Sequence, residues 1–402
     1  MTTATSTTTV GPVRPFTLSL TRHRTLVVAG TLAVLAAIVY LVTGPAGAGG
    51  DEYIPLAGAL LHGQLTVEAR SWVELIPAGV GWFVPFPPVP VTFYLPVVAL
   101  MGVQPWDTEL AVGVMPAIVG GLSVGLAFLA LRNRLAVKEG EALWICAGFA
   151  TTTLWWAAGM GGTHLMAQVS AVLFMLGALY LALDHRWPLL AGFLFALAVG
   201  SRLPVGLALP IFVYLYRGRS WLFIAGAMPV AAVLALYNLA RFDSVLDFGY
   251  ARIPSGKGLV TDEPWYASGI MSPLYIPRGF GAAFLSWPKL VDVAPFIKPS
   301  LYADTLLLTA PFLAWVVLAR GRLALVAAVS AVLVLVVDFM HGNPGFAQFG
   351  YRFILDSMPL WLIVIGLGMR DRAPVPFRLA VIVGAVVTTY GFWATTVGFA
   401  AY

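Results

Sequence analysis

The chain has 402 residues, of which 60% are hydrophobic and only 10% are charged, with a mean hydropathy of +0.88 and a formal net charge of +5. Soluble domains carry about 25% charged residues, so this composition excludes a soluble protein and predicts a polytopic helical membrane protein. Long apolar runs argue against a membrane β-barrel, which would show short alternating segments. The single cysteine excludes an intramolecular disulfide. The basic residues are spread along the chain, which argues against nucleic acid as a partner.

The N-terminal tail, residues 1–24, ends in basic residues, and the first predicted span follows at 25–43. Arg22 and Arg24 place the N-terminus in the cytoplasm, because short cytoplasmic segments are enriched in Lys and Arg. A cleaved signal peptide is the alternative, since residues 46–48 (Ala-Gly-Ala) resemble a cleavage site. The apolar run is longer than the roughly 7–15 residues of a signal sequence, which favours an uncleaved span.

An acidic pair, Asp51 and Glu52, stands where the chain leaves this first span. Apolar residues recur at helical spacing over 53–61, which predicts an amphipathic helix on the membrane surface with an acidic head. Asp51 can accept a hydrogen bond from the first helical turn. The alternative interpretation is that Asp51 only caps the helix and that Glu52 is only a favourable charge in its first turn.

The first outer loop is predicted at 44–108. Its apolar run 91–101 follows the Pro-rich segment 84–90 and is too short for a span of about 20 residues, so it predicts a second surface helix. Further spans are predicted, in chain order, at 109–131, 142–158, 165–183, 221–239, 303–319, 323–340, 354–369 and 376–399.

The segment 187–216 is apolar except for Ser201 and Arg202, and both of its flanks are basic. One helix of this length would reach about 45 Å, which exceeds the hydrocarbon core, and two full spans need more residues. Two short helices therefore fit, with Arg202 in the turn between them at or below the outer surface. A charge at that depth is a candidate functional residue.

The predicted topology has eleven spans, an outer loop at 241–300 with a surface segment at 280–295, and C-terminal transmembrane helices within 301–402. Most of the 23 Lys and Arg residues flank the predicted cytoplasmic ends, whereas most acidic residues fall in the outer segments. The cytoplasmic connections are too short for a nucleotide-binding site, and no Walker A loop occurs. The chemistry is therefore expected on the outer face.

Three stretches resemble the GT-C class of membrane glycosyltransferases, in particular the bacterial family 39 proteins akin to protein O-mannosyltransferases and aminoarabinose transferases. They are Gly-Asp-Glu-Tyr at 50–53, Phe-Pro-Pro-Val-Pro at 86–90 and Phe-Gly-Tyr-Arg-Phe-Ile-Leu-Asp at 349–356. Residues 238–250 are also similar. Many relatives carry an Arg-x-Asp pattern where this chain has Gly-Thr-His at 162–164.

The resemblance implies an all-α, GT-C-like catalytic module at 25–240 that includes the first outer loop. It also implies a polyprenyl-phosphate-linked sugar donor and an acceptor hydroxyl on a glycan, lipid or protein. The reaction is expected at the periplasmic or extracellular side of the cell (inner) membrane, with inversion at the anomeric carbon. Some members of the class use a divalent cation and others do not, and Asp51 with Glu52 is too small a ligand set to decide.

The resemblance and the residue types together predict a site. Asp51 is expected to be the general base, which contributes about 10²–10⁴-fold, with Glu52 beside it as a second catalytic candidate. Fixed cations stabilise the leaving phosphate, and the candidates are Arg202, Arg352 and Arg241. The candidates for substrate binding are Tyr53, His164, His341, Gln348 and Tyr351.

Each arginine has an alternative role. Arg202 can pair with a buried acidic residue, Arg352 can extend to the membrane interface, and Arg241 can pair with Asp243. The two histidines lack ligand spacing, so hydrogen bonding is predicted for them and no metal site.

A lipid or small-molecule transporter, such as a flippase, is the alternative function, and a non-enzymatic scaffold is a third. Transporters tend to show internal repeats and polar residues inside several spans. Here no repeat is visible, and the predicted span interiors are nearly free of charge apart from Arg202 and Asp338. Surface chemistry is therefore favoured.

Overall fold

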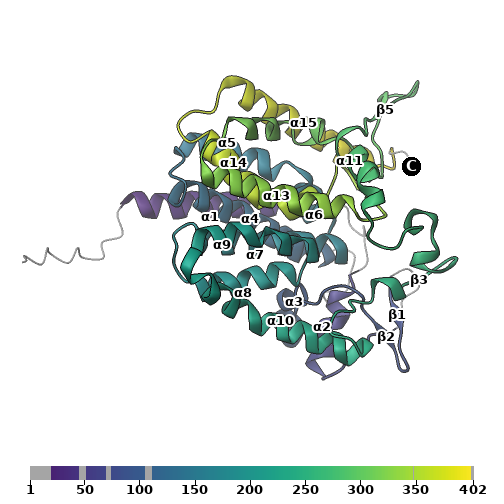
Figure 1. Ribbon diagram of the computed structural model, residues 1–402. Coiled ribbons are helices and arrows are strands. Elements are labelled where there is room, and N and C mark those ends of the chain that lie inside the picture. The colour runs from purple at the N-terminus through teal and green to yellow at the C-terminus, as the bar shows by residue number, and fades with distance from the viewer. Residues whose placement is uncertain (1–19, 45–50, 69–73, 105–110, 347, 400–402) are drawn as a thin grey trace, which may run out of the picture.

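A computed structural model describes residues 20–44, 51–68, 74–104, 111–346 and 348–399, which form a bundle of helices with three small hairpins (Figure 1). The α-helices are α1 (Leu20–Thr43), α2 (Tyr53–Leu61), α3 (Val91–Met101), α4 (Val114–Asn133), α5 (Glu139–Ala150), α6 (Thr153–Met160), α7 (Thr163–Ala182), α8 (Pro188–Val199), α9 (Leu209–Tyr216), α10 (Ser220–Phe242), α11 (Ile276–Phe284), α12 (Leu306–Thr309), α13 (Arg322–Phe339), α14 (Ile354–Gly368) and α15 (Val375–Thr396). The hairpins pair β1 (Ile76–Pro77) with β2 (Trp82–Phe83), β3 (Pro254–Ser255) with β4 (Gly258–Leu259), and β5 (Lys289–Leu290) with β6 (Ile297–Lys298).

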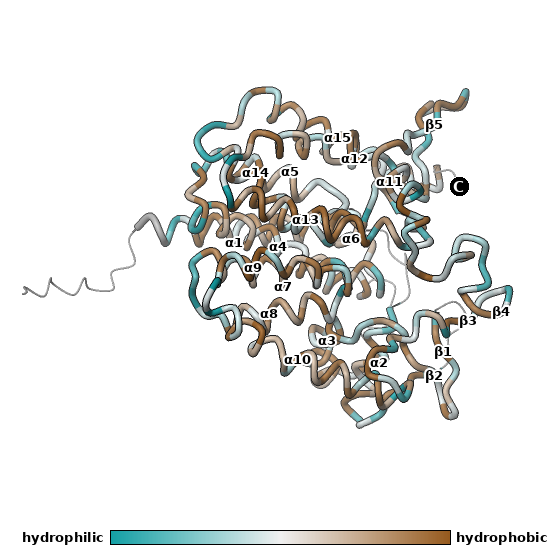
Figure 2. Tube along the Cα trace, viewed as in Figure 1, coloured by the Kyte–Doolittle hydropathy of each residue, from teal (hydrophilic) through white to brown (hydrophobic). Residues whose placement is uncertain are grey.

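Six helical stretches of the described residues are long and apolar enough to cross a membrane. They are His23–Thr43, Val114–Asn133, Thr163–Ala182, Leu203–Phe242, Arg322–Phe339 and Val375–Thr396, and α3, α8 and α14 are shorter apolar helices. Figure 2 shows apolar residues along the bundle and polar residues concentrated at its ends. The prediction of a multi-pass helical membrane protein is confirmed, while the count of eleven spans stays a prediction.

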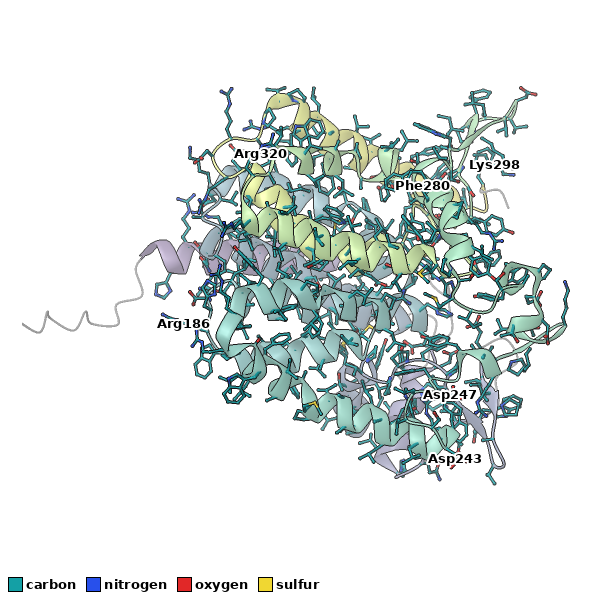
Figure 3. All side chains as sticks on the ribbon, viewed as in Figure 1. Arg186, Asp243, Asp247, Phe280, Lys298 and Arg320 are labelled. Carbon is teal, nitrogen blue, oxygen red and sulfur yellow. The ribbon has the colours of Figure 1, made fainter. Side chains whose placement is uncertain are left out.

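The charged residues predicted for the two sides of the membrane lie at opposite ends of the bundle. Figure 3 shows Arg186 and Arg320 at one end and Asp243, Asp247 and Lys298 at the other. We call the second end the outer end, following the topology predicted from the sequence.

Three local predictions are confirmed. The helices expected at 53–61 and 91–101 are present as α2 and α3, and they pack against each other. The segment 187–216 forms two short helices, α8 and α9, and Arg202 lies between them just before a 3-10 helix at Leu203–Ala208. However, α2 is less peripheral than an interfacial helix, because Tyr53, Ile54, Leu56 and Ala57 are buried.

Three predicted segments are interrupted. The span expected at 142–158 is divided into α5 and α6, because the Thr152 side chain accepts a hydrogen bond from Leu154 N–H and starts a new helix. The span expected at 303–319 consists of α12 and a 3-10 helix that begins at Pro311, a residue that cannot continue the helical hydrogen bonds. The surface segment expected at 280–295 is α11 followed by the β5–β6 hairpin.

Helices α8 and α10 approach so closely that only glycine fits at their contact. A Cβ atom at Gly192 would lie 1.8 Å from the Phe223 carbonyl oxygen, and one at Gly226 would lie 1.9 Å from the Leu189 carbonyl oxygen. Small residues at helix contacts let backbones pack tightly inside a membrane, where the hydrophobic effect between helices is absent. This contact joins the first turns of α8 to the first turns of α10, at the end of α8 opposite to the turn with Arg202.

We expect Gly192→Ala to lower the free energy of unfolding by about 1–3 kcal/mol, because the added methyl group overpacks the contact. Thermal unfolding of the purified protein in detergent measures the change. Gly30→Ala on α1 is the matched control, since a Cβ there meets nothing within 4 Å. Equal stability of Gly192→Ala and Gly30→Ala would contradict the close contact.

Candidate functional site at the outer end of the bundle

The first turns of α7 contact three segments that are far apart in the sequence. The Glu52 N–H donates to Thr163 Oγ1 at 2.8 Å, and the Gln168 side chain donates to the Arg352 carbonyl oxygen at 3.3 Å. Between them, His164 Nε2 lies 3.5 Å from the Glu74 carboxylate. Five residues of helix rise by about 7.5 Å, so α7 brings the acidic pair, Glu74 and Arg352 into one small region.

Asp51 is held at the start of α2 by two hydrogen bonds. Its Oδ1 accepts from the Tyr53 N–H at 2.6 Å, and its Oδ2 accepts from the Tyr94 hydroxyl at 2.7 Å. The Tyr53 hydroxyl in turn donates to the Pro87 carbonyl oxygen at 3.1 Å. Asp51 therefore accepts a hydrogen bond from the first turn of α2, as predicted, although Glu52 occupies the N-cap position, and Asp51 is also joined through Tyr94 to α3. The buried carboxylate has a fixed orientation, which a proton acceptor needs.

Glu52 is also buried, but its environment is different. Its Oε2 has no hydrogen-bond partner among the described residues, and the side chain is 4% exposed. Burial, together with the charges of Glu74 and Asp51, raises the pKa of Glu52 to about 8, against the opposing effect of a hydrogen bond with Thr163. At neutral pH most Glu52 side chains therefore carry a proton.

Glu74 is paired with His164 and lies near both the acidic pair and Arg352. Burial raises its pKa, but the hydrogen bond and charge of His164 and the charge of Arg352 outweigh burial and lower it. Glu74 is thus ionised beside a protonated Glu52. It lies close enough to affect the pKa values of both Glu52 and Arg352.

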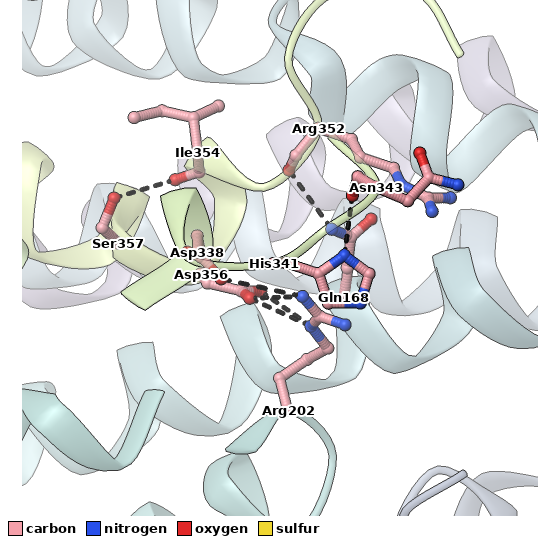
Figure 4. A network of polar contacts seen from close by, with 9 residues as sticks. All are labelled: Gln168, Arg202, Asp338, His341, Asn343, Arg352, Ile354, Asp356 and Ser357. Atoms are coloured by element: carbon pink, nitrogen blue, oxygen red, sulfur yellow. Dashed lines mark hydrogen bonds and ion pairs between the residues drawn. The ribbon is translucent and has the colours of Figure 1, made fainter. Parts of the chain in front are cut away.

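Arg202 makes a buried ion pair, which was the alternative predicted for it. Its Nη2 and Nε lie 2.8 and 2.9 Å from Asp356 Oδ2, and Nη2 lies 3.9 Å from Asp338 Oδ1 (Figure 4). The guanidinium carbon lies 5.2 Å from the centre of the Phe353 ring. Two carboxylates therefore face one cation, and a phosphate-binding role for Arg202 stays a prediction.

Arg352 has no carboxylate within ion-pair distance among the described residues. Its Nε is buried without a hydrogen-bond partner in the same set, and its guanidinium carbon lies 5.3 Å from the Phe353 ring centre. Burial and the charge of Arg202 lower the pKa of Arg352 to about 10, while Glu74 and Asp356 act in the opposite direction. A desolvated cation without a counter-ion is suited to bind an anion.

The neighbouring histidine is neutral. Burial, together with the charges of Arg202 and Arg352, lowers the pKa of His341 to about 4 against the opposing effect of its contact with Asn343, whose carbonyl oxygen lies 2.7 Å from Nδ1 (Figure 4). His341 therefore contributes hydrogen-bonding groups to the site and no charge. His164 packs edge-on against Phe86, with ring centres 4.5 Å apart.

The structure places the other candidates outside this region or in supporting positions. Arg241 is buried, with Nη1 donating to the Val84 carbonyl oxygen at 2.5 Å and Nη2 to Asn238 at 2.9 Å, and Asp243 is not among its described partners. It anchors the Pro-rich segment. The Gln348 amide donates to the carbonyl oxygens of Tyr302 and Pro344, and Tyr351 is fully buried.

Four residues of the site were missed from the sequence: Asp338, Asp356, Tyr94 and Glu74. A charge inside an apolar span needs a partner of opposite sign, so Asp338 and Asp356 could have been named as candidate partners of a buried arginine, although not of Arg202 in particular. The sequence carries no comparable signal for Tyr94 or Glu74.

The fold and the position of this site define a multi-pass membrane protein with a GT-C-like fold, as the three sequence stretches predicted. The chain is similar to ArnT, an aminoarabinose transferase, from Cupriavidus metallidurans, whose crystal structure contains undecaprenyl phosphate. The TM-score is 0.50 at 17% identity, over 92% of this chain and 65% of ArnT. The chain thus spans slightly less than two thirds of ArnT.

A second similar structure is the apo oligosaccharyltransferase of Archaeoglobus fulgidus, with a TM-score of 0.48 at 13% identity, over 93% of this chain and 56% of that one. No protein-family model and no curated protein matches the chain. The likeness to ArnT establishes the fold, and the function is inferred below from the site.

We expect Asp356→Asn to lower the free energy of unfolding by about 3 kcal/mol, because it leaves Arg202 buried without its main counter-ion. Asp184→Asn is the control, since Asp184 pairs with Arg134 and Arg186 at the surface, where such pairs contribute about 0–1 kcal/mol. Both are measured by thermal unfolding in detergent. A loss no larger than that of the control would show that the ion pair does not stabilise the fold.

The raised pKa of Glu52 predicts a pH-dependent stability. Between its ordinary value of 4.5 and about 8, the folded protein binds more protons at this site than the unfolded chain does. Raising the pH through this window therefore lowers the free energy of unfolding. Glu52→Gln stays neutral, so its stability relative to the wild type should increase from about pH 5 to about pH 8 and then level off.

Unfolding of both proteins across this range tests the expectation. Glu68→Gln, at an exposed position of the same loop, controls for the loss of one carboxylate. A constant difference between the wild type and Glu52→Gln at every pH would contradict a buried, protonated Glu52.

Proposed function

We propose that this protein is a glycosyltransferase that moves a sugar from a polyprenyl-phosphate donor to an acceptor hydroxyl at the outer face of the membrane. One observation carries this function: the first two turns of α7 bring the acidic pair near the backbone of Arg352, a cation whose Nε is buried and which has no counter-ion among the described residues. A transfer from a lipid phosphate requires a proton acceptor and an anion-binding group in the same site.

The donor phosphate is assigned to Arg352, whose planar guanidinium can bond two phosphate oxygens. Arg202 adds positive charge nearby, balanced by Asp338 and Asp356 in the absence of the donor. Arg241 does not contact the donor in this proposal. It is hydrogen-bonded to the Pro-rich segment, and the Tyr53 hydroxyl donates to the same segment.

The polyprenyl tail is assigned to an apolar groove of about 520 Å³ between α9 and α13. The turn with Arg202 leads into α9, and α13 carries Asp338 at its outer end, whereas the groove residues of α13 lie in its first turns, toward the opposite end of the bundle. It is lined by Leu209, Pro210, Val213, Tyr214, Leu325, Val326 and Val329. ArnT is a protein of the same fold that binds an undecaprenyl phosphate.

In the proposed reaction, Asp51 takes the proton of the acceptor hydroxyl while the hydroxyl oxygen of the acceptor bonds to the anomeric carbon. The bond from that carbon to the phosphate oxygen breaks, and its electron pair stays on the phosphate beside Arg352. The Tyr94 hydroxyl holds the Asp51 carboxylate in position. Protonated Glu52 donates a hydrogen bond to a sugar or acceptor oxygen.

Tyr53, His164 and His341 are assigned to the walls of the substrate site. Gln348 and Tyr351 shape the loop that carries Arg352. Among the described residues, no group of three or more His, Cys, Asp or Glu side chains is placed to hold a metal ion.

The proposed topology has eleven crossings of the cell membrane, a cytoplasmic N-terminus and the site on the periplasmic or extracellular side. The acceptor is a hydroxyl of a glycan, a lipid or a protein.

The test is turnover of a panel of radiolabelled polyprenyl-phosphate sugars by the protein reconstituted in lipid. Asp51→Asn should lower sugar release by about 10²-fold or more with donor binding retained, and Arg352→Gln should weaken donor binding. Asp243→Asn and Arg252→Gln are matched controls at exposed outer positions.

Turnover that is equal in wild type and Asp51→Asn would exclude Asp51 as the base. Movement of the intact lipid across the bilayer without release of sugar would contradict the proposed transferase and support the alternative function, a transporter.

A further inference from the structure

The β5–β6 hairpin forms an arm at the outer end, beside the last turns of α15 (Figure 1). It is the central part of the segment 285–302, which we call the arm. Its base is fixed to the start of α12, because the Thr305 N–H donates to the Ser286 carbonyl oxygen at 2.7 Å and Ser286 Oγ donates to the Ala303 carbonyl oxygen at 2.7 Å. The Tyr390 hydroxyl of α15 donates to the Ile297 carbonyl oxygen.

The arm exposes large apolar side chains along its whole length. Leu290 is 84% exposed, Val293 68% and Phe296 57%. Leu285, Trp287, Ile297 and Tyr302 are also exposed. Single exposed apolar residues are common on proteins, but a continuous patch of this kind marks a surface that contacts something else.

The β3–β4 hairpin shows that an outer hairpin of this chain need not be apolar. It has the same strand lengths, but its tip consists of Gly256 and Lys257, and Ser255 Oγ donates to the Leu259 carbonyl oxygen. The apolar residues of the arm are therefore a property of this hairpin and not of its exposed position.

The two lysines of the arm favour an anionic partner. Lys289 and Lys298 are paired directly across the two strands, and no ion pair of either is found among the described residues. Like charges in this position destabilise a hairpin. The one acidic residue of the arm, Asp292, lies at its tip.

The position of the arm favours lipid as this partner. Lys298 Nζ lies 5.8 Å from the centre of the Phe399 ring, three residues after the end of α15, and α15 is a candidate membrane span. Figure 3 shows Lys298 at the outer end, on the same side of the bundle as the exposed Phe280 of α11. Trp, Tyr and Lys side chains are typical of the boundary between headgroups and acyl chains.

We propose that the arm is a membrane-binding site, in which Leu290, Val293 and Phe296 enter the outer leaflet and Lys289 and Lys298 bind the headgroups of anionic phospholipids. Binding there would hold the outer end, and with it the start of α12, at a fixed depth in the bilayer. This site is distinct from the donor site, which lies between α7, α9 and α13.

The experiment uses the full chain with Cys146→Ala, because the native Cys146 is buried and is the one cysteine. Val293→Cys is labelled with a polarity-sensitive fluorophore, and Lys257→Cys in the β3–β4 hairpin is the matched control. Both proteins are reconstituted in phosphatidylcholine and in an equimolar mixture with phosphatidylglycerol.

The Val293→Cys label should emit at shorter wavelength than the Lys257→Cys label and be quenched several-fold more by lipids brominated on the acyl chain. Phosphatidylglycerol should strengthen the quenching, and Lys289→Glu with Lys298→Glu should abolish this lipid dependence. A Val293→Cys label as accessible to aqueous iodide as the control would overturn the proposal and indicate a protein partner. Equal quenching with and without phosphatidylglycerol would show that Lys289 and Lys298 do not bind anionic headgroups.

Discussion

The ion pair between Arg202 and Asp356 is the interaction on which the outer end of the bundle depends. A charge buried in a protein is tolerated only when a partner of opposite sign lies close by, and Arg202 has two, Asp356 on α14 and Asp338 on α13. The pair joins the turn after α8 to the ends of two helices from the C-terminal part of the chain. The loop between those helices is thereby held in place, and this loop carries His341 and Arg352.

A second set of contacts, at the start of α7, connects this loop to the acidic stretch near the N-terminus. Thr163 and Gln168 are hydrogen-bonded to Glu52 and to the backbone of Arg352, and His164 is paired with Glu74. Glu52 is protonated and neutral, Glu74 is ionised and Arg352 is charged. Because one of the two carboxyl groups keeps its proton, the three ionisable groups lie near one another without strong repulsion.

Several predicted spans contain breaks or 3-10 helices in place of continuous α-helix. The break between α5 and α6 and the 3-10 helices beside α9 and α12 interrupt segments that the sequence pattern predicts as spans. Such irregular backbone is stable at membrane depth only where it is buried in protein or lines a cavity. One of these interruptions, the 3-10 helix at Leu203–Ala208, follows Arg202 and directs the chain into α9, which lines the apolar groove.

Composition and hydrophobic periodicity were sufficient to predict a helical membrane protein, the helices at 53–61 and 91–101, and the short pair of helices around Arg202, because these features depend on local sequence and on the thickness of a bilayer. The short motifs around Asp51, Pro87 and Arg352 were sufficient to predict the GT-C-like fold. The partners of the charged residues were not predictable in the same way. Asp356 lies 154 positions from Arg202, and Glu52 lies 111 positions from Thr163, so only the packing of the helices decided which arginine is neutralised and which carboxylic acid keeps its proton.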